Sequence, residues 1–188
     1  MGPLQQPAVL KGRLPDSPFV WRAVGFVERA YADAQDAAGA DHSFEVAAIL
    51  GPSRSEVILA IALLHDILED TDTNVASIRR GFGGAVSELV ELLTEDESIR
   101  SYPQRKGALR AVVRSAPREA QLVFAADKLA KVRAVVRSGK APPKRRWRHY
   151  LESQAMLVDT GIDKRLVNRL GRELAAAGAA LGLPVPAG

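Results

Sequence analysis

The sequence of residues 56–72 is Glu-Val-Ile-Leu-Ala-Ile-Ala-Leu-Leu-His-Asp-Ile-Leu-Glu-Asp-Thr-Asp, and this stretch decides the fold. Its first half, from Val57 to Leu64, is an unbroken apolar run, which is typical of a helix buried on most sides. Burying ionisable groups at the end of such a helix costs free energy unless a cation or a hydrogen-bond network compensates them. The stretch therefore predicts a metal site with nearby chemistry. The ionisable residues that follow the apolar run are His65, Asp66, Glu69 and Asp70.

The composition indicates a globular protein built around one core. The chain has 188 residues, of which 47% are apolar, and this suits one domain with a full-sized core. There is no cysteine, which excludes disulfides and thiolate zinc sites. Histidines and carboxylates remain as the side chains able to bind a metal ion.

Neither a membrane segment nor a secretion signal is expected. No apolar run reaches the length of a membrane span, and the N-terminus lacks the basic and then apolar order of a signal peptide. We therefore expect a cytoplasmic protein with no membrane partner. Lys and Arg exceed Asp and Glu by 26 to 22, a mild excess that is consistent with a phosphate-bearing ligand.

Helical periodicity runs through most of the chain, and no strand-like alternation of useful length interrupts it. The pattern predicts an all-α fold of about eight or nine helices, in one domain over residues 18–182. Residues 1–17 hold three prolines and no period, which indicates a flexible lead-in, and residues 183–188 are a tail. Ser17, Ser55 and either Thr73 or Asn74 are expected to cap helices.

Two details of the predicted helices concern the site. A short helix is expected over residues 44–50, with His42 just ahead of it, and the helix capped by Ser55 is expected to continue through Asp70. His65 would then lie one turn from Glu69.

The candidate metal ligands are His42, the pair His65 and Asp66, and the distant Asp127. Two imidazoles and two carboxylates make a mixed nitrogen and oxygen site that suits manganese, iron or zinc. Plainer interpretations stay open at this point. His42 is also placed as a neighbour of a helix cap, and Asp127 is placed to pair with Lys131 at the i+4 position.

These residues resemble a known family, the HD-domain metal phosphohydrolases, whose signature is His…His-Asp…Asp. The stretch from His65 to Thr71 also resembles the His-Asp-x-x-Glu-Asp-Thr motif of the RelA/SpoT hydrolase domains and their small stand-alone relatives. Further similar segments occur in the family's order, and the resemblance covers roughly residues 26–174. These segments are 42–50, Phe82-Gly83 through Leu92-Leu93-Thr94, and Ala126-Asp127-Lys128-Leu129 with Arg133.

The resemblance implies an activity, a metal and a division of roles. The family hydrolyses the 3′-pyrophosphate of guanosine tetra- and pentaphosphate, usually with manganese. The resemblance assigns the proton transfers to Glu69 and Asp70, as catalytic residues. It places Arg146 and Tyr150 where the family contacts its substrate, and we expect Lys131, at the position of a family asparagine, to bind the substrate with them. It assigns the metal to His42, His65, Asp66 and Asp127.

The chain departs from the family pattern near the expected substrate. Residues 36–41 carry no base and no aromatic where the family has an Arg-Lys pair and a Tyr. Ser43 replaces a proline, and Lys131 replaces an asparagine. Two alternatives therefore stay open: an HD-domain phosphohydrolase acting on another nucleotide, and a non-catalytic module that binds a nucleotide without hydrolysing it.

A basic run from Lys140 to Arg148 contains Trp147 and is followed by His149 and Tyr150, a pattern that also fits RNA binding. A solvated helix start whose aromatic rings dock on the core is favoured over nucleic acid. Contacts from Arg146 and Tyr150 to a nucleotide fit better still. Arg105 and Lys106 are interpreted as a solvated helix face, with phosphate contacts as the alternative. The sequence gives His149 no role.

Overall fold

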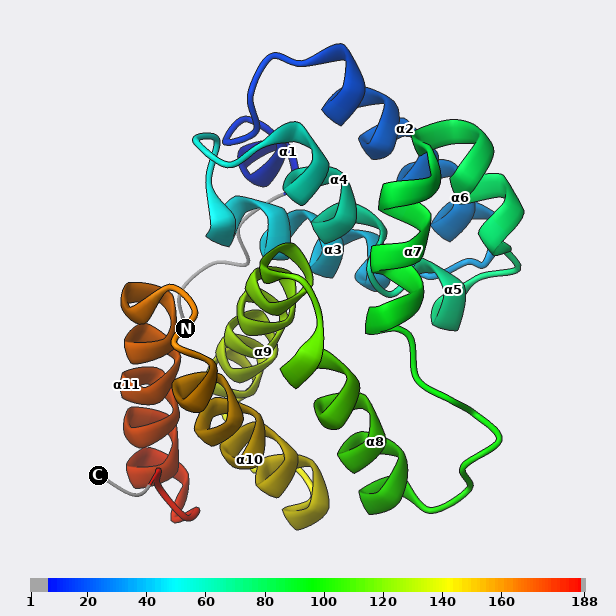
Figure 1. The fold of residues 1–188 in the computed structure, drawn as a ribbon. Coiled ribbons are helices and arrows are strands. Elements are labelled where there is room, and N and C mark those ends of the chain that lie inside the picture. The colour runs from blue at the N-terminus through cyan, green and yellow to red at the C-terminus, as the bar shows by residue number, and fades with distance from the viewer. Residues whose placement is uncertain (1–6, 187–188) are drawn as a thin grey trace. The chain divides into compact units, whose positions relative to one another are not determined.

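The structure is a computed structural model that describes residues 7–186, and these residues form helices and connecting loops with no strand (Figure 1). The all-α class is confirmed, and nine of the eleven helices in this described part of the chain have eight residues or more, because only α1 and α5 are shorter. The helices are α1 (Pro7–Lys11), α2 (Pro18–Asp33), α3 (Ala37–Leu50), α4 (Glu56–Leu64), α5 (Ile67–Asp70), α6 (Val75–Phe82), α7 (Gly84–Leu93), α8 (Tyr102–Ser115), α9 (Arg118–Ser138), α10 (Lys144–Thr160) and α11 (Lys164–Leu181).

Helices α1 to α7 form the first of two compact units, which ends at Thr94. Its core is α4, whose residues from Leu59 to Leu64 are fully buried, as their unbroken apolar character predicts. Helices α2, α3 and α7 pack against α4, α5 packs against α2, and α1 packs against α3. The expected caps are present, since the hydroxyl oxygen of Ser17 accepts from the Val20 amide and that of Ser55 accepts from the Ile58 amide.

Helices α8 to α11 form the second compact unit, which begins at Glu95. Its long helix α9 packs against α8, α10 and α11, and Figure 1 shows α9 beside these three. Every residue from Ala120 to Ala130 is buried. The indole Nε1 of Trp147 donates to the carbonyl oxygen of Pro184, 2.7 Å away, so the aromatic part of the basic run does dock on the core.

Three local features differ from the expectations. Helix α3 begins at Ala37 rather than Phe44, because the Asp36 carboxylate caps it by accepting from the Gly39 amide at 3.1 Å. The helix expected to run through Asp70 is interrupted after Leu64 and resumes as α5. Helix α1 was not predicted at all, since only Leu10 among its residues is a buried large apolar side chain.

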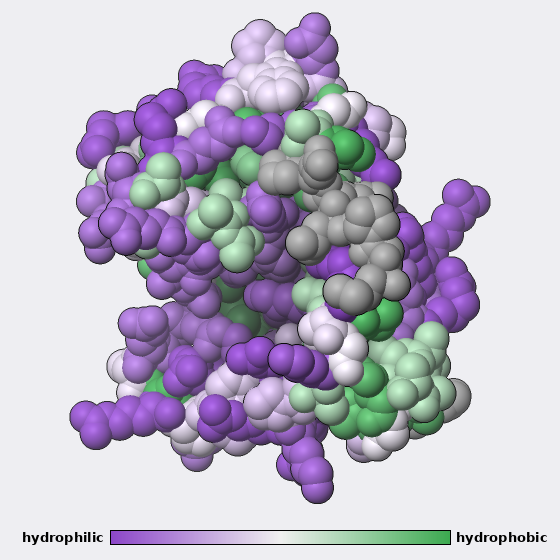
Figure 2. All heavy atoms as spheres, turned by 180° about the vertical axis from the view of Figure 1, so that it is seen from behind, coloured by the Kyte–Doolittle hydropathy of each residue, from purple (hydrophilic) through white to green (hydrophobic). Residues whose placement is uncertain are grey.

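The division at Thr94 and Glu95 lies inside the predicted single domain, whose boundaries at residues 18 and 182 stay predictions. Within residues 7–186, no helix combines the length and the apolar character that a membrane crossing requires. Hydrophilic residues dominate the face shown in Figure 2. The large apolar side chains that are exposed in the described residues are isolated along the chain, and Val136 is the most exposed of them.

Candidate functional site

Helix α3 holds His42 one and a half turns into the helix rather than ahead of it. Because the helix is capped upstream by Asp36, the interpretation of His42 as a neighbour of a cap is wrong. The imidazole is about four-fifths buried, and its Nε2 lies 3.5 Å from Oδ2 of Asp66.

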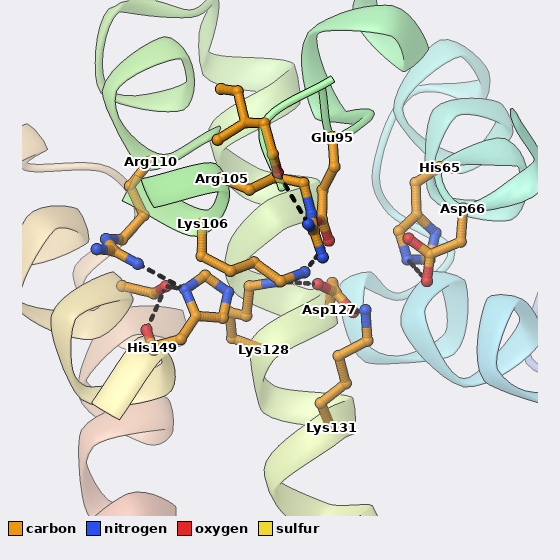
Figure 3. A network of polar contacts seen from close by, with 12 residues as sticks. His65, Asp66, Glu95, Arg105, Lys106, Arg110, Asp127, Lys128, Lys131 and His149 are labelled. Carbon is orange, nitrogen blue, oxygen red and sulfur yellow. Dashed lines mark hydrogen bonds and ion pairs between the residues drawn. The ribbon is translucent and has the colours of Figure 1, made fainter. Parts of the chain in front are cut away.

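The break between α4 and α5 brings His65 and Asp66 together. Asp66 has φ −99° and ψ −1°, in the sparsely populated bridge region where many active-site residues lie. The Nδ1 of His65 lies 2.8 Å from the carbonyl oxygen of Ala62, and because a carbonyl only accepts, Nδ1 carries the proton. In the neutral ring Nε2 therefore offers a lone pair, and it lies 3.2 Å from Oδ2 of Asp66 (Figure 3).

This arrangement fits a divalent cation. A ring lone pair and a carboxylate oxygen repel each other at 3.2 Å unless a positive charge lies next to both. The ligand atoms of His42, His65 and Asp66 all lie within 4.8 Å of one another. The carbonyl of Ala62 fixes the tautomer and orientation of His65, as outer hydrogen bonds do for metal-binding histidines.

The short helix α5 carries both predicted catalytic carboxylates. Glu69 is half-buried and Asp70 is exposed. The hydroxyl of Tyr31, on α2, donates to Oδ2 of Asp70 over 3.0 Å. Burial, and next the charge of Asp70, raise the pKa of Tyr31 far above its ordinary value, so this hydroxyl keeps its proton and remains a donor. The sequence indicated Tyr31 only as part of a helix face, since nothing local marks a residue that bonds 39 positions away.

The fourth predicted ligand, Asp127, belongs to α9 of the second unit. It is buried, and its two carboxylate oxygens contact the ammonium groups of Lys128 at 2.5 Å and Lys131 at 3.0 Å. The expected i+4 pair with Lys131 is therefore present. Its role as a metal ligand stays a prediction.

The second unit contains a basic pocket of about 560 Å³, within the range of small-molecule sites. Lys131, Arg146 and Tyr150 all line it, so the structure brings the three predicted substrate residues together, while their role stays a prediction. No carboxylate is among its lining residues. The remaining lining residues are Tyr102, Lys106, Lys128, Ala134, Val135, Ser138, Lys140, Ala141, Pro142 and His149.

Arg105 and Lys106 do not form a solvated helix face, and that interpretation was wrong. Both are more than three-quarters buried, and both contact the carboxylate of Glu95, with Arg105 Nε 2.6 Å from Oε2 (Figure 3). The sequence missed this because Glu95 lies in a loop ten residues upstream, beyond the reach of helical spacing arguments.

Comparison with known protein families agrees with this set of candidate residues. A family model described as HD domain matches residues 23–157, which is most of the chain. This chain belongs to the HD domain family.

Curated relatives of this chain are described as guanosine-3′,5′-bis(diphosphate) 3′-pyrophosphohydrolase MESH1. The mouse protein (Mus musculus) is 39% identical over 77 residues, which is 41% of this chain and 42% of the relative. The human protein (Homo sapiens) is 35% identical over 103 residues, which is 54% of this chain and 57% of the relative. The chain thus spans about half the length of the curated relatives it matches.

Solved structures confirm the fold. One, described as a metazoan ortholog of SpoT that hydrolyses ppGpp, has a TM-score of 0.72 and 24% identity, covering 87% of this chain and 98% of the other. Another, lmo0812 from Listeria monocytogenes EGD-e, has a TM-score of 0.61 and 25% identity, covering 75% of this chain and 99% of the other.

Proposed function

We propose that this HD-domain chain is a metal-dependent phosphohydrolase that removes the 3′-pyrophosphate of guanosine tetra- and pentaphosphate. The observation that carries the proposal is the orientation of His65, whose unprotonated Nε2 faces the same Asp66 oxygen as His42. Relatives described as 3′-pyrophosphohydrolases of guanosine bis(diphosphate) support the substrate. The carboxylates on α5 support catalysis, because a protein that only binds has no need of them there.

Manganese is the proposed metal, and the donors that would hold it are His42, His65 and Asp66. When bound, a divalent ion polarises a phosphoryl oxygen and lowers the pKa of a water ligand. Mixed nitrogen and oxygen donors suit manganese, and the lack of any cysteine argues against a thiolate zinc site.

Asp127 is proposed as the fourth ligand, on the strength of the HD signature. Its buried carboxylate has cationic neighbours in Lys128 and Lys131, which keep it ionised as a ligand must be. Replacing it with asparagine should weaken manganese binding at least tenfold, measured by titration calorimetry. Unchanged affinity would remove Asp127 from the ligand set.

Glu69 and Asp70 are proposed to move the protons of the hydrolysis. Water adds to the phosphorus, the bond between that phosphorus and the 3′ oxygen breaks, and pyrophosphate leaves. One carboxylate accepts the proton of the attacking water, and the other returns a proton to the 3′ oxygen. The hydrogen bond from Tyr31 holds Asp70 in one orientation for this task.

The basic pocket is proposed to bind the phosphate groups of the nucleotide. Lys131 and Arg146 supply positive charge, and Tyr150 supplies an aromatic ring and a hydroxyl. Burial raises the pKa of Tyr150 to about 12, so its hydroxyl stays protonated at neutral pH and can donate to a phosphate oxygen.

The direct test is hydrolysis of guanosine tetraphosphate with manganese, followed by chromatography of the nucleotide product and an assay of pyrophosphate. We expect equal amounts of guanosine diphosphate and pyrophosphate. Glu69→Gln and Asp70→Asn should each lower kcat about a hundredfold or more. Their matched controls are Glu88→Gln and Asp159→Asn, which change exposed carboxylates.

The segment 36–41 favours a second candidate, a phosphohydrolase for another nucleotide, because it carries no base there. A panel of nucleotides separates the two. No turnover of guanosine tetraphosphate beside turnover of another nucleotide would contradict the leading proposal. Binding without turnover of any nucleotide, with affinity lost on replacing Glu69 and Asp70 together, would identify a non-catalytic module.

A further inference from the structure

His149 lies at the basic pocket without a role in the proposed hydrolysis. It belongs to α10, only 3% of it is exposed, and it is one of the pocket's lining residues. Its Nδ1 lies 2.7 Å from Nη1 of Arg110, and Nη2 of Arg110 lies 2.6 Å from the carboxylate of Glu152. A carboxylate, a guanidinium and an imidazole thus follow one another toward the pocket.

This chain of contacts fixes which ring nitrogen carries the proton. A guanidinium only donates, so Nδ1 of His149 accepts and the proton of the neutral ring is on Nε2. The hydroxyl of Ser153 lies 3.4 Å from Nδ1, but it donates to the main-chain carbonyl of His149 at 2.7 Å. Arg110 is therefore the group that sets the tautomer.

The ring is also held neutral. Burial, and next the positive charges of Lys128, Lys106 and Arg110, move the pKa of His149 far below its usual range. Nε2–H is therefore a neutral donor at every pH near 7. Within residues 7–186 no group accepts a hydrogen bond from it. Buried donors in native proteins nearly always have an acceptor, and an exception calls for an explanation.

The surroundings of the ring indicate the missing acceptor. Five cationic residues line the pocket and no acidic residue does. Lys106 contacts Glu95, and Lys128 and Lys131 share Asp127. Even so, cations outnumber these carboxylates by five to two, which favours an anion with several negative oxygens. We propose that His149 is a ligand-binding residue whose Nε2–H donates to an oxygen of a pyrophosphate group bound in this pocket. The inference rests on the proposed function only for the identity of that ligand. The cationic lining residues are Lys106, Lys128, Lys131, Lys140 and Arg146.

Access to Nε2 depends on two long side chains. Figure 3 shows the Nε2 side of the ring facing Lys106 and Lys128. Lys106 contacts Glu95 and the buried Lys128 contacts Asp127, so a pyrophosphate group that reaches Nε2 shares these two ammonium groups with the two carboxylates. A neutral donor between cations adds a hydrogen bond to the anion without adding a further positive charge to the empty pocket.

The first test reads the proton directly, on the unaltered protein. The chain has only three histidines, so nitrogen-15 imidazole spectra assign each of them with single variants. At pH 7 we expect His149 to carry its proton on Nε2, and inorganic pyrophosphate, added with EDTA, should shift that proton's resonance. A proton on Nδ1, or an Nε2–H resonance that saturating pyrophosphate leaves unchanged, would overturn the proposal.

The second test removes the donor. Titration calorimetry with inorganic pyrophosphate in EDTA should show affinity about ten- to a hundredfold weaker for His149→Phe. His149→Gln should keep most of the affinity, because its amide nitrogen occupies a place near Nε2. Equal affinity of the phenylalanine variant and the parent would contradict the proposal, with circular dichroism confirming that both are folded.

The third test separates orientation from charge. Arg110→Met should let the ring exchange between tautomers and should weaken pyrophosphate binding. Arg114→Met, on the same helix but paired with the exposed Asp159, should do neither. Weaker binding in Arg110→Met with the proton still held on Nε2 would refute the role of the tautomer. None of these experiments requires turnover, so a failure of the proposed hydrolase leaves their outcome readable.

Discussion

At the residue scale, the hydrogen bond between Tyr31 and Asp70 predicts a kinetic effect. Tyr31→Phe should lower kcat about fivefold or more and leave KM unchanged, because a hydrogen bond to a catalytic carboxylate is lost. The acid limb of the rate against pH should also move to higher pH, since that bond favours the ionised carboxylate. If Tyr31→Phe lowers the stability of the protein but leaves its kinetics unaltered, Tyr31 contributes to packing only.

The buried neutral ring of His149 predicts an acid-dependent loss of stability. Its folded pKa lies below the unfolded value of about 6.5, so below that pH the unfolded chain takes up a proton that the folded chain does not. The free energy of unfolding should fall by up to about 1.4 kcal/mol per pH unit as the pH drops below about 6.5. Urea unfolding at pH 7 and pH 5 should show this loss in the parent and not in His149→Gln.

At the same scale, the sequence marks the candidate metal ligands His65 and Asp66 more clearly than Tyr31 or His149. His65 and Asp66 are adjacent and interrupt an apolar run. The free-energy cost of burying two ionisable side chains there is enough to indicate a site from the sequence alone. Nothing near Tyr31 or His149 in the sequence indicates a role, because the residue that each contacts lies 39 positions away on another helix. Contacts of that separation follow from tertiary packing, which periodicity does not encode.

At the scale of the element, caps were the most predictable features and interruptions the least. Ser17, Ser55 and Asn74 cap the helices they were expected to cap, because capping depends on residues within three positions. The extension of α3 back to Ala37 was missed, because this stretch contains Gly39 and glycine has a low helix propensity. A glycine stands at this helical position because the Tyr31 ring fills the space that a side chain would occupy.

The close contact of α3 with α2 predicts a large cost for one methyl group. A Cβ at Gly39 would lie 2.2 Å from Cε1 of Tyr31, so Gly39→Ala must displace that ring and should destabilise the fold by about 1–3 kcal/mol. Gly81→Ala is the matched control, because a Cβ at Gly81 meets nothing within 4 Å and the change raises helix propensity. If both variants unfold at similar urea concentrations, displacing the Tyr31 ring between α2 and α3 costs no free energy of unfolding, which would contradict the prediction.

At the scale of the whole molecule, the candidate metal centre predicts stabilisation by manganese. An ion that binds only the folded chain adds about 2.7 kcal/mol at a hundred times its Kd, which corresponds to a rise in Tm of roughly 5–10 °C. Calorimetry of EDTA-treated protein with and without manganese should show it, and His42→Ala should abolish it. A shift equal in parent and variant would place the ion elsewhere.

The overall class was predictable, while the division into two compact units was not. An apolar period of 3.6 residues predicts helices with a buried face. The lack of cysteine leaves apolar packing, rather than disulfides, to hold the core. The change of unit at Thr94 and Glu95 falls in a polar loop that resembles any other surface connection in the sequence.

The burial of Trp147 gives this protein an internal optical reporter. Its ring lies 6.2 Å from that of Tyr150, which lines the basic pocket, whereas the second tryptophan, Trp21, is 41% exposed on the first unit. Replacing Trp21 with phenylalanine leaves one emitter next to the pocket. Anion occupancy then becomes visible as a change in ultraviolet fluorescence, in real time and without any label.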